Sequence, residues 1–139
     1  MKITKAPLPK SVPPEYFTGD VSVLHTQGVH PDPLMDVVLV TFPPGGRTAW
    51  HHHVGPQILV VVEGCCRVQT EGGPVQDVAT GGTVRFESGE LHWHGATPDA
   101  PMVHVALQMK GVPVDPFTIW SDPVTDAEYD GAALTTGAR

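Results

Sequence analysis

The stretch that decides the fold is GGRTAWHHHVGPQILVVVEG, residues 45–64, in which three adjacent histidines precede a Gly-Pro pair and an apolar run. Successive side chains of a β-strand point to opposite faces, so His51 and His53 share one face and His52 takes the other. Gln57 has the same parity as His51 and His53. The stretch therefore predicts strand segments that present two imidazoles and an amide to one side.

The same parity recurs in two later segments. In LHWHGAT, His92 and His94 share a face and Trp93 takes the opposite one. In MVHVALQM, His104 lies on the face opposite that of two valines and a leucine. Five of the eight histidines can therefore face a single interior.

Each histidine taken alone could also have a purely structural role. A lone histidine on an apolar strand is commonly a hydrogen-bonded core residue, and three adjacent histidines could form a solvated turn. The matched parity favours a metal site instead, because several imidazoles buried together need neutralising partners or a shared cation. His25 and His30 lie in loop-like segments, and the sequence assigns them no role.

The rest of the chain has the pattern of short strands separated by turns, since its 15 glycines and 15 prolines interrupt short apolar runs. The candidate strands span residues 20–26, 36–42, 57–64, 65–71, 74–79, 83–88, 91–97 and 102–109. Their regular spacing predicts an all-β sandwich or barrel. Thr125 and Glu128 have capping-box spacing and predict a short C-terminal helix. We expect an extended N-terminal arm over residues 1–17 and a single domain over residues 18–139.

Charge and hydropathy argue against several partners. The formal net charge is −7 and the eight Lys and Arg residues are scattered, whereas phosphate-backbone binding needs clustered cations, so we expect no nucleic-acid partner. No run of 18 apolar residues predicts a membrane span, and prolines near the N-terminus replace the apolar segment of a secretory signal. The sequence thus favours a cytoplasmic protein with a small-molecule substrate.

Residues 36–42 and 57–63 are apolar on both faces, which predicts strands that are covered on both sides. In a chain this short, the second covering layer is expected to include another copy of the chain, in a homodimer or higher homo-oligomer. A second sheet from the same chain is the alternative. The two cysteines, Cys65 and Cys66, are adjacent on a predicted strand, where a mutual disulfide would be strained, so we expect reduced thiols.

Two spaced motifs carry a family resemblance. The first comprises Gly45, His51, His53, Gln57 and Gly64. The second comprises Gly81, Glu87, Gly89 and His92, with Ala96 at its closing position. Both spacings are those of the cupins, so the chain resembles a single-domain cupin, whose fold is a double-stranded β-helix or jelly-roll barrel. It departs from the usual pattern in having glutamine at 57, where most metal-binding cupins have glutamate, and in lacking the second motif's usual proline and asparagine.

A narrower resemblance covers most of the chain. Segments such as PPGGRTAWHHH, HWHGATP and MVHVALQ are similar to carboxymuconolactone-decarboxylase-associated cupins, a group that includes bacterial manganese-dependent hydroxynitrile lyases. This resemblance implies metal ligation by two histidines and the glutamine of the first motif and one histidine of the second, which here are His51, His53, Gln57 and His92. It also implies that His94 and His104 act as catalytic acid/base groups, with Thr48 nearby in the substrate pocket.

Nitrogen and oxygen ligands without thiolate suit Mn²⁺ or Fe²⁺, with Ni²⁺, Co²⁺ or Zn²⁺ as further options. Because all four ligands are neutral, the ion keeps its full charge and favours redox-neutral lyase or isomerase chemistry on a hydroxy or carbonyl compound. An iron-dependent dioxygenase is the alternative, and a non-catalytic small-molecule-binding cupin is a second. Arg85 is a candidate substrate anchor, although an ion pair at a strand edge would also explain it.

Overall fold

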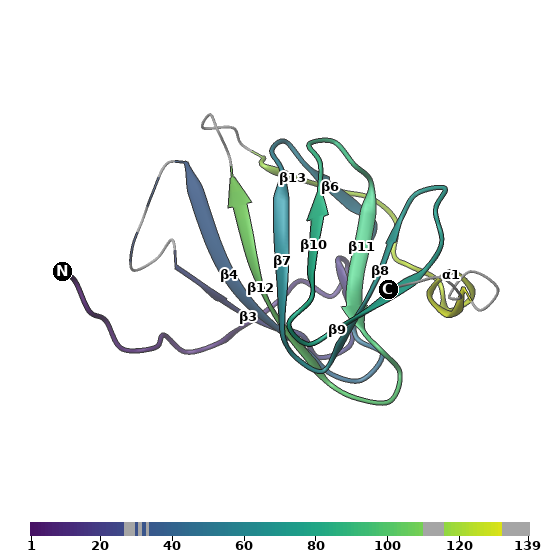
Figure 1. Cartoon of the computed structure of the whole chain (residues 1–139), viewed down its shortest axis with the longest axis horizontal. Helices are drawn as coiled ribbons and strands as arrows, with labels where there is room; N and C mark the ends of the chain where they lie inside the picture. The colour runs from purple at the N-terminus through teal and green to yellow at the C-terminus, as the bar shows by residue number, and fades with distance from the viewer. Residues whose placement is uncertain (27–29, 31, 33, 110–115, 132–139) are drawn as a thin grey trace.

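A computed structural model describes residues 1–26, 30, 32, 34–109 and 116–131, and these form two antiparallel sheets that face each other (Figure 1). The six-stranded sheet has the strand order β1 (Lys10–Ser11), β3 (Ser22–His25), β4 (Met35–Phe42), β12 (Met102–Met109), β7 (Gln57–Glu63) and β10 (Thr83–Phe86). The other sheet has the order β13 (Thr118–Trp120), β6 (His51–His53), β11 (His92–Ala96), β5 (Arg47–Thr48) and β2 (Phe17–Thr18), while β8 (Cys65–Thr70) pairs with β11 and β9 (Gln76–Ala79) pairs with β8. The predicted all-β barrel is confirmed.

All eight strands expected from the sequence are present, with bounds that agree within a few residues. The strand β6 carries the three histidines whose alternation the sequence displays, whereas β1, β2, β5 and β13 were not predicted. These four strands have only two or three residues each, which is too short for an alternating pattern to be recognised. The predicted C-terminal helix is α1 (Asp126–Asp130), and Thr125 and Glu128 form both halves of the capping box.

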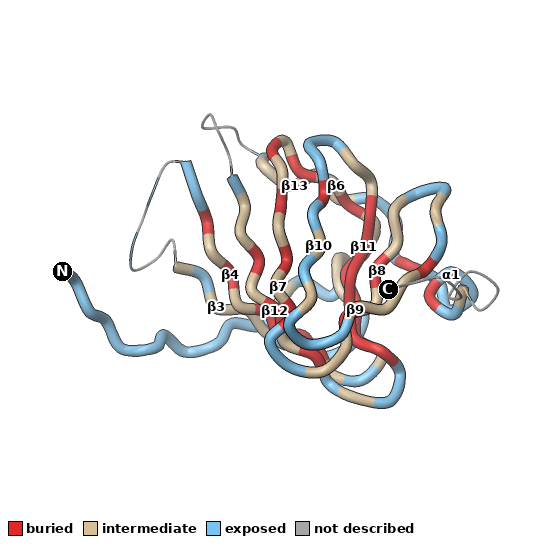
Figure 2. The backbone as a smooth tube through the Cα atoms, viewed as in Figure 1, coloured by how far each residue is buried: buried red, intermediate tan, exposed pale blue. Residues whose placement is uncertain are grey.

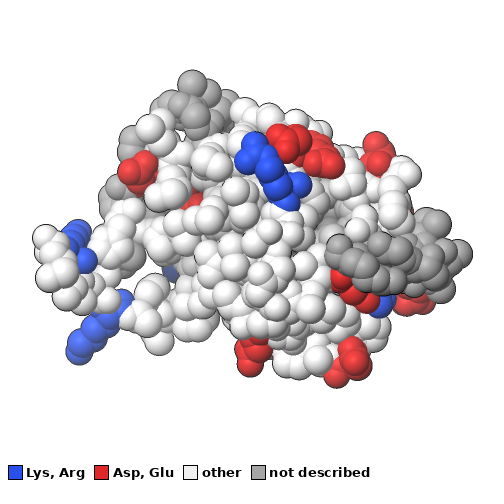
Figure 3. Space-filling view, viewed as in Figure 1, with Lys and Arg blue, Asp and Glu red and all other residues white. Residues whose placement is uncertain are grey.

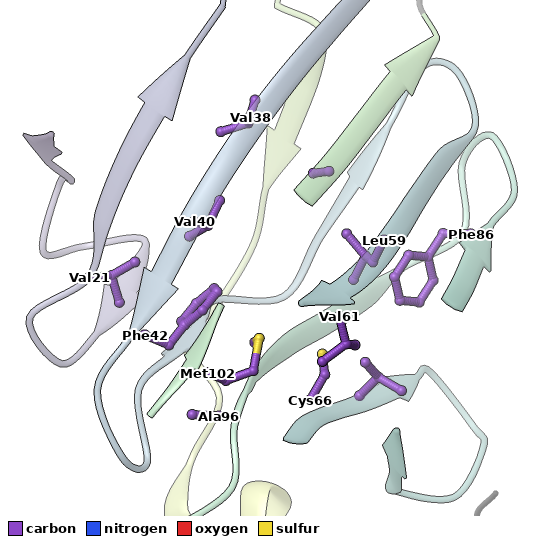
Figure 4. Packing of buried hydrophobic residues seen from close by; sticks show 12 residues of the cluster. Val21, Val38, Val40, Phe42, Leu59, Val61, Cys66, Phe86, Ala96 and Met102 are labelled. Carbon is purple, nitrogen blue, oxygen red and sulfur yellow. The ribbon is translucent and has the colours of Figure 1, made fainter. Parts of the chain in front are cut away.

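Alternation along the strands separates the barrel interior from its outer surface (Figure 2). In β12, Met102, His104 and Ala106 are buried, whereas Val103 and Val105 are partly exposed on the opposite face. The inner faces pack into one apolar core, shown in Figure 4. Its largest fully buried members include Phe42, Leu59 and Met102.

The turn between β7 and β8 depends on a glycine of the first motif. Gly64 has a φ of +74°, a conformation that residues with a side chain rarely adopt. A Cβ atom at this position would lie 2.1 Å from the carbonyl oxygen of Pro101, so backbone approach also excludes a side chain. The glycine thus holds the loop before β12 against the end of β7.

The N-terminal segment divides into two parts. Residues 1–9 have no strand pairing, are exposed and project from the barrel (Figures 1 and 2). Residues 10–17, which the sequence placed in the same arm, lie against the barrel, because Lys10 and Ser11 pair with β3 and Phe17 pairs with Thr48 of β5. This second part contributes to the wall of the cavity described below.

Both cysteines are free thiols, as expected. Cys66 is fully buried on the inner face of β8, and burial raises the pKa of its thiol. In the described part of the chain, no helix combines the length and the apolar character needed to cross a membrane.

Candidate metal and acid/base site

Three strands bring together the histidines and the glutamine that the sequence singled out as ligands. His51 and His53 lie on β6, His92 lies opposite His51 on the neighbouring strand β11, and Gln57 begins β7 in the facing sheet. All four side chains are at least 97% buried. His52 is on the other face of β6, as its parity predicts, and is only partly buried.

The three imidazoles have the spacing of a metal-binding group. One ring nitrogen from each of His51, His53 and His92 lies within 4.8 Å of the corresponding atoms of the other two. The Nδ1 atoms of His51 and His92 lie 2.9 Å and 2.7 Å from the backbone carbonyl oxygens of Ala49 and Glu90. A carbonyl oxygen can only accept, so each Nδ1 carries the proton and each Nε2 keeps a lone pair for a metal ion.

His53 is oriented in the same manner by a hydroxyl group. Its Nδ1 lies 2.9 Å from Oγ1 of Thr118 on β13. The Nε2 atoms of His53 and His92 and the Oε1 atom of Gln57 are buried and have no hydrogen-bond partner among the described residues. Buried polar atoms rarely lack partners, so these converging atoms fit a divalent cation that all three would coordinate.

Burial keeps the histidines neutral at physiological pH. Desolvation lowers the pKa of His53 to about 4 and that of His92 to about 3. At His53 the neighbouring Gln57 amide acts in the opposite direction and raises the pKa, but by less than burial lowers it. The pKa of His51 is also well below its usual value, because of burial and the neighbouring imidazoles. Neutral imidazole is the form that binds a metal ion, so ligation needs no proton release near pH 7.

Two further histidines form a hydrogen-bonded pair beside these ligands. Nε2 of His104 lies 3.0 Å from Nδ1 of His94, and the rings of His94 and His51 have centroids 5.3 Å apart. Burial lowers the pKa of His104 to about 4 and that of His94 well below its usual value. Thr48 lies next to the pair, since its Oγ1 accepts a hydrogen bond from the backbone N–H of His94.

Two aromatic residues near the ligands, Phe86 and Trp93, pack in different places. Phe86 stacks on His92 with ring centroids 3.6 Å apart and planes 12° apart. Trp93 points away from the ligands and packs with Val75, Val124 and Tyr129 in a second apolar cluster, as its parity predicts.

A cavity of about 580 Å³ opens beside these histidines. Its lining includes His51, His53, Gln57, His94 and His104, together with Thr48. This volume is within the usual range of small-molecule sites. The five inward histidines and Thr48 predicted from the sequence therefore lie at or next to one cavity.

The sequence did not reveal the aromatic wall of this cavity. Tyr16 and Trp120 stack with centroids 4.7 Å apart, and Phe17 meets Trp120 edge-on. Trp120 also pairs with His51 across β13 and β6. These residues come from the N-terminal segment and from a strand of three residues, where short pairing leaves no periodic pattern to detect.

The two arginines near the motifs lie outside the cavity, and Arg85 forms the strand-edge ion pair that the sequence offered as its alternative role. Arg85 does not line this cavity; its half-exposed side chain forms an ion pair with Glu87 at 2.8 Å, so its candidate role as a substrate anchor finds no support in the geometry. Arg47 is 6% exposed. Its guanidinium donates to the carbonyl oxygen of Val124 and to Asp126, which lie almost eighty residues away in the sequence.

Comparison with known proteins agrees with this fold. A family model described as "Cupin domain" matches residues 38–107. An (R)-mandelonitrile lyase from Granulicella tundricola is 44% identical over 120 residues, which are 84% of this chain and 88% of that protein.

Solved structures share the fold. A cupin-like protein from Thermotoga maritima is 33% identical, with a TM-score of 0.82 over 99% of each chain. An oxalate decarboxylase from Bacillus subtilis is 15% identical, with a TM-score of 0.61 over 80% of this chain and 29% of that one, a likeness of fold alone.

Proposed function

The chain belongs to the cupin family, and from this membership and the geometry of the site we propose that it is a metal-dependent lyase acting on a small hydroxy or carbonyl compound. The proposed ligands are His51, His53, Gln57 and His92, and the proposed metal is Mn²⁺ or Fe²⁺. The observation that carries the proposal is the convergence of buried, unpartnered ligand atoms on one point beside a cavity.

A divalent ion held by these four neutral ligands would supply Lewis acidity toward a substrate oxygen. The chain's own residues would bind the substrate and move its proton. Trp120, Phe17 and Tyr16 offer an apolar wall for a hydrocarbon or aromatic portion of the substrate. The name of the relative from Granulicella tundricola makes a cyanohydrin the first substrate class to examine.

His94 and His104 are suited to handle the proton. Both are neutral near pH 7, because burial lowers their pKa values, so a lone pair is available on the pair to accept a hydroxyl proton. The hydrogen bond between them allows a proton taken up by one ring to be passed to the other. In a cyanohydrin cleavage, one ring would accept the hydroxyl proton as the C–C bond breaks, and the other would assist the departing cyanide. No net oxidation occurs.

The test combines metal analysis with a cyanohydrin cleavage assay in which dissolved oxygen is monitored. We expect close to one Mn²⁺ or Fe²⁺ per chain and release of aldehyde and cyanide without oxygen uptake. His92→Ala should lose both metal and turnover. His52→Ala is the matched control, since His52 is the neighbouring histidine on the opposite face of β6, and it should retain both.

Two results would contradict the proposal. Oxygen consumption in step with substrate loss would indicate dioxygenase chemistry. Wild-type protein that neither contains nor takes up Mn²⁺, Fe²⁺, Ni²⁺, Co²⁺ or Zn²⁺ would remove the metal site and leave a cupin that binds a small molecule.

We also propose that a second copy of the chain covers the outer face of the six-stranded sheet. Cross-strand pairing places Leu39, Val105 and Val60 in one row of that face, and Val37, Leu107 and Ile58 form the next row. The corresponding area is largely free of charge in Figure 3. Val105→Glu should convert a dimer measured by light scattering into a monomer, whereas a wild-type monomer would refute the interface.

A further inference from the structure

Among the described residues, five buried side-chain polar atoms have no hydrogen-bond partner: Asp36 Oδ1, His53 Nε2, Gln57 Oε1, His92 Nε2 and His104 Nδ1. Four of them belong to the proposed metal ligands and the histidine pair. The fifth, on Asp36, belongs to neither. Asp36 is 7% exposed and lines the same cavity.

The other carboxylate oxygen of Asp36 has a neighbour. Its Oδ2 lies 3.4 Å from Nδ1 of His25, a half-exposed side chain at the end of β3. This contact fixes the carboxylate on one side, and Oδ1 has no donor among the residues that the structure describes. A buried carboxylate oxygen that lacks a donor is costly unless a ligand supplies one, because desolvation removes the water that would otherwise bind it.

The sheet register relates Asp36 to the proposed ligands. Asp36 of β4 pairs with Gln108 of β12, and Gln108 pairs with Gln57 of β7, so the three stand in one transverse row. Adjacent strands are about 4.8 Å apart, which separates the backbones of Asp36 and Gln57 by about 10 Å. The cavity thus has the metal ligands at one end of this row and a carboxylate at the other.

The cavity wall at this row is mixed: Gln108 stands between Asp36 and Gln57, and apolar side chains line the cavity in the next row. Val38 and Ala106 are the next inward-facing residues of β4 and β12 beyond Asp36 and Gln108, and both line the cavity. An elongated ligand with a polar group at each end and an apolar middle fits these parts of the cavity wall. A benzene ring with an oxygen function at opposite ends, plus a hydrogen bond of about 2.8 Å at the far oxygen, spans a comparable length.

We propose that Asp36 is a specificity residue that accepts a hydrogen bond from a hydroxyl group at the far end of the substrate. The proposal rests on the proposed function, since it takes the near end to be the reacting hydroxy or carbonyl carbon. A neutral hydroxyl fits better than an ammonium group, because Lys10 on β1, which carries an ammonium group, also lines the cavity and would repel a cation. The substrate class is therefore a ring compound that carries a hydroxyl opposite its reacting carbon.

The experiment compares 4-hydroxybenzaldehyde with benzaldehyde as ligands of the metal-loaded protein, by calorimetric titration. Wild type should bind the hydroxylated ring about 10- to 100-fold more tightly, as expected for one hydrogen bond to a charged acceptor. Asp36→Asn should reduce the preference, and Asp36→Val, which continues the valine wall, should abolish it. Both variants should bind benzaldehyde as wild type does, which also shows that they are folded.

Asp99→Asn is the matched control, because it removes an equal charge from an exposed loop residue that does not line the cavity. It should retain the full preference. Equal binding of the two aldehydes by wild type, weaker binding or no binding of the hydroxylated one, or an unchanged preference in Asp36→Val, would overturn the assignment.

Turnover of the two corresponding cyanohydrins separates this proposal from the proposed function. A hydroxyl preference that depends on Asp36, without any cyanohydrin cleavage, would support the subsite and refute the reaction. Cleavage without such a preference would support the reaction and refute the subsite.

Discussion

Two clusters of buried polar side chains lie on opposite sides of β11, and they differ in whether their hydrogen bonds are completed within the chain. Around Arg47, the guanidinium donates to the Val124 carbonyl oxygen at 2.9 Å and to Asp126 at 2.8 Å, and it lies over the Tyr129 ring. The Tyr129 hydroxyl donates to the carbonyl oxygen of Ala96, and the Trp93 indole donates to Gln69. We call these residues the Arg47 cluster.

The histidine cluster, formed by His51, His53, His92, His94 and His104, leaves three ring nitrogens without partners among the described residues. An unpartnered buried polar atom costs free energy, and a ligand that supplies the missing partners would offset this cost. We infer that the cluster whose hydrogen bonds are all made stabilises the fold, whereas the cluster with unpartnered ring nitrogens binds a ligand. Substitutions in the Arg47 cluster should therefore change stability, and substitutions in the histidine cluster should change metal binding or turnover.

The largest expected effect is on catalysis. His94→Ala removes half of the proton-transferring pair but none of the proposed metal ligands, so turnover should fall by about 10²- to 10⁴-fold while metal content stays at the wild-type level. Steady-state kinetics and elemental analysis of the same preparation measure the two effects. Full turnover in this variant would remove the acid/base role, and loss of metal would assign His94 to the ligand set.

Acid should destabilise the metal-free protein through the histidine cluster. The pKa values of His53 and His104 are lowered to about 4 in the folded state, whereas the unfolded chain has the ordinary histidine value of about 6.5. Between these values the unfolded state binds more protons, so the free energy of unfolding falls as the pH falls. The slope reaches about 1.4 kcal/mol per pH unit for each such histidine.

Urea unfolding of the metal-free protein at intervals from pH 8 to pH 5 measures this dependence. The decline should begin as the pH falls below about 7 and steepen toward pH 5. A stability that stays constant over that range would mean that the histidines are protonated equally in both states, and would contradict their burial as neutral groups.

The Arg47 cluster should respond in stability alone. Arg47→Met leaves the buried carbonyl oxygen of Val124 without its donor, and should lower the free energy of unfolding by about 2 kcal/mol with no change in metal content. Arg85→Met is the matched control, because within the described part of the chain the exposed Arg85 side chain pairs with Glu87 alone, and the unfolding midpoint of this variant should match that of wild type. A metal deficit in Arg47→Met would show that the two clusters are not independent.

Sequence reasoning found the histidine cluster more readily than the Arg47 cluster, for a physical reason. The inward placement of the histidines follows from alternation within single strands, a local property of the sequence, and the cupin resemblance then implies which of them are ligands. The partners of Arg47 lie at positions 124 and 126, and no local pattern at position 47 indicates them. The same holds for Trp120 and Asp36, whose places in the cavity depend on strand pairing over long sequence distances.

Two threonines provide the finest comparison, since each has a side-chain hydroxyl that serves one cluster. Thr118→Val removes the group that orients His53, and should lower metal affinity by about 10-fold or more with little effect on the metal-free protein's stability. Thr125→Ala removes the N-cap of α1, which packs Tyr129 against Arg47, and should cost about 1 kcal/mol of stability with no change in metal affinity. Metal titration and urea unfolding measure the metal affinity and the stability of both variants. If Thr125→Ala lowered metal affinity as much as Thr118→Val does, the division between a binding cluster and a stabilising cluster would be wrong.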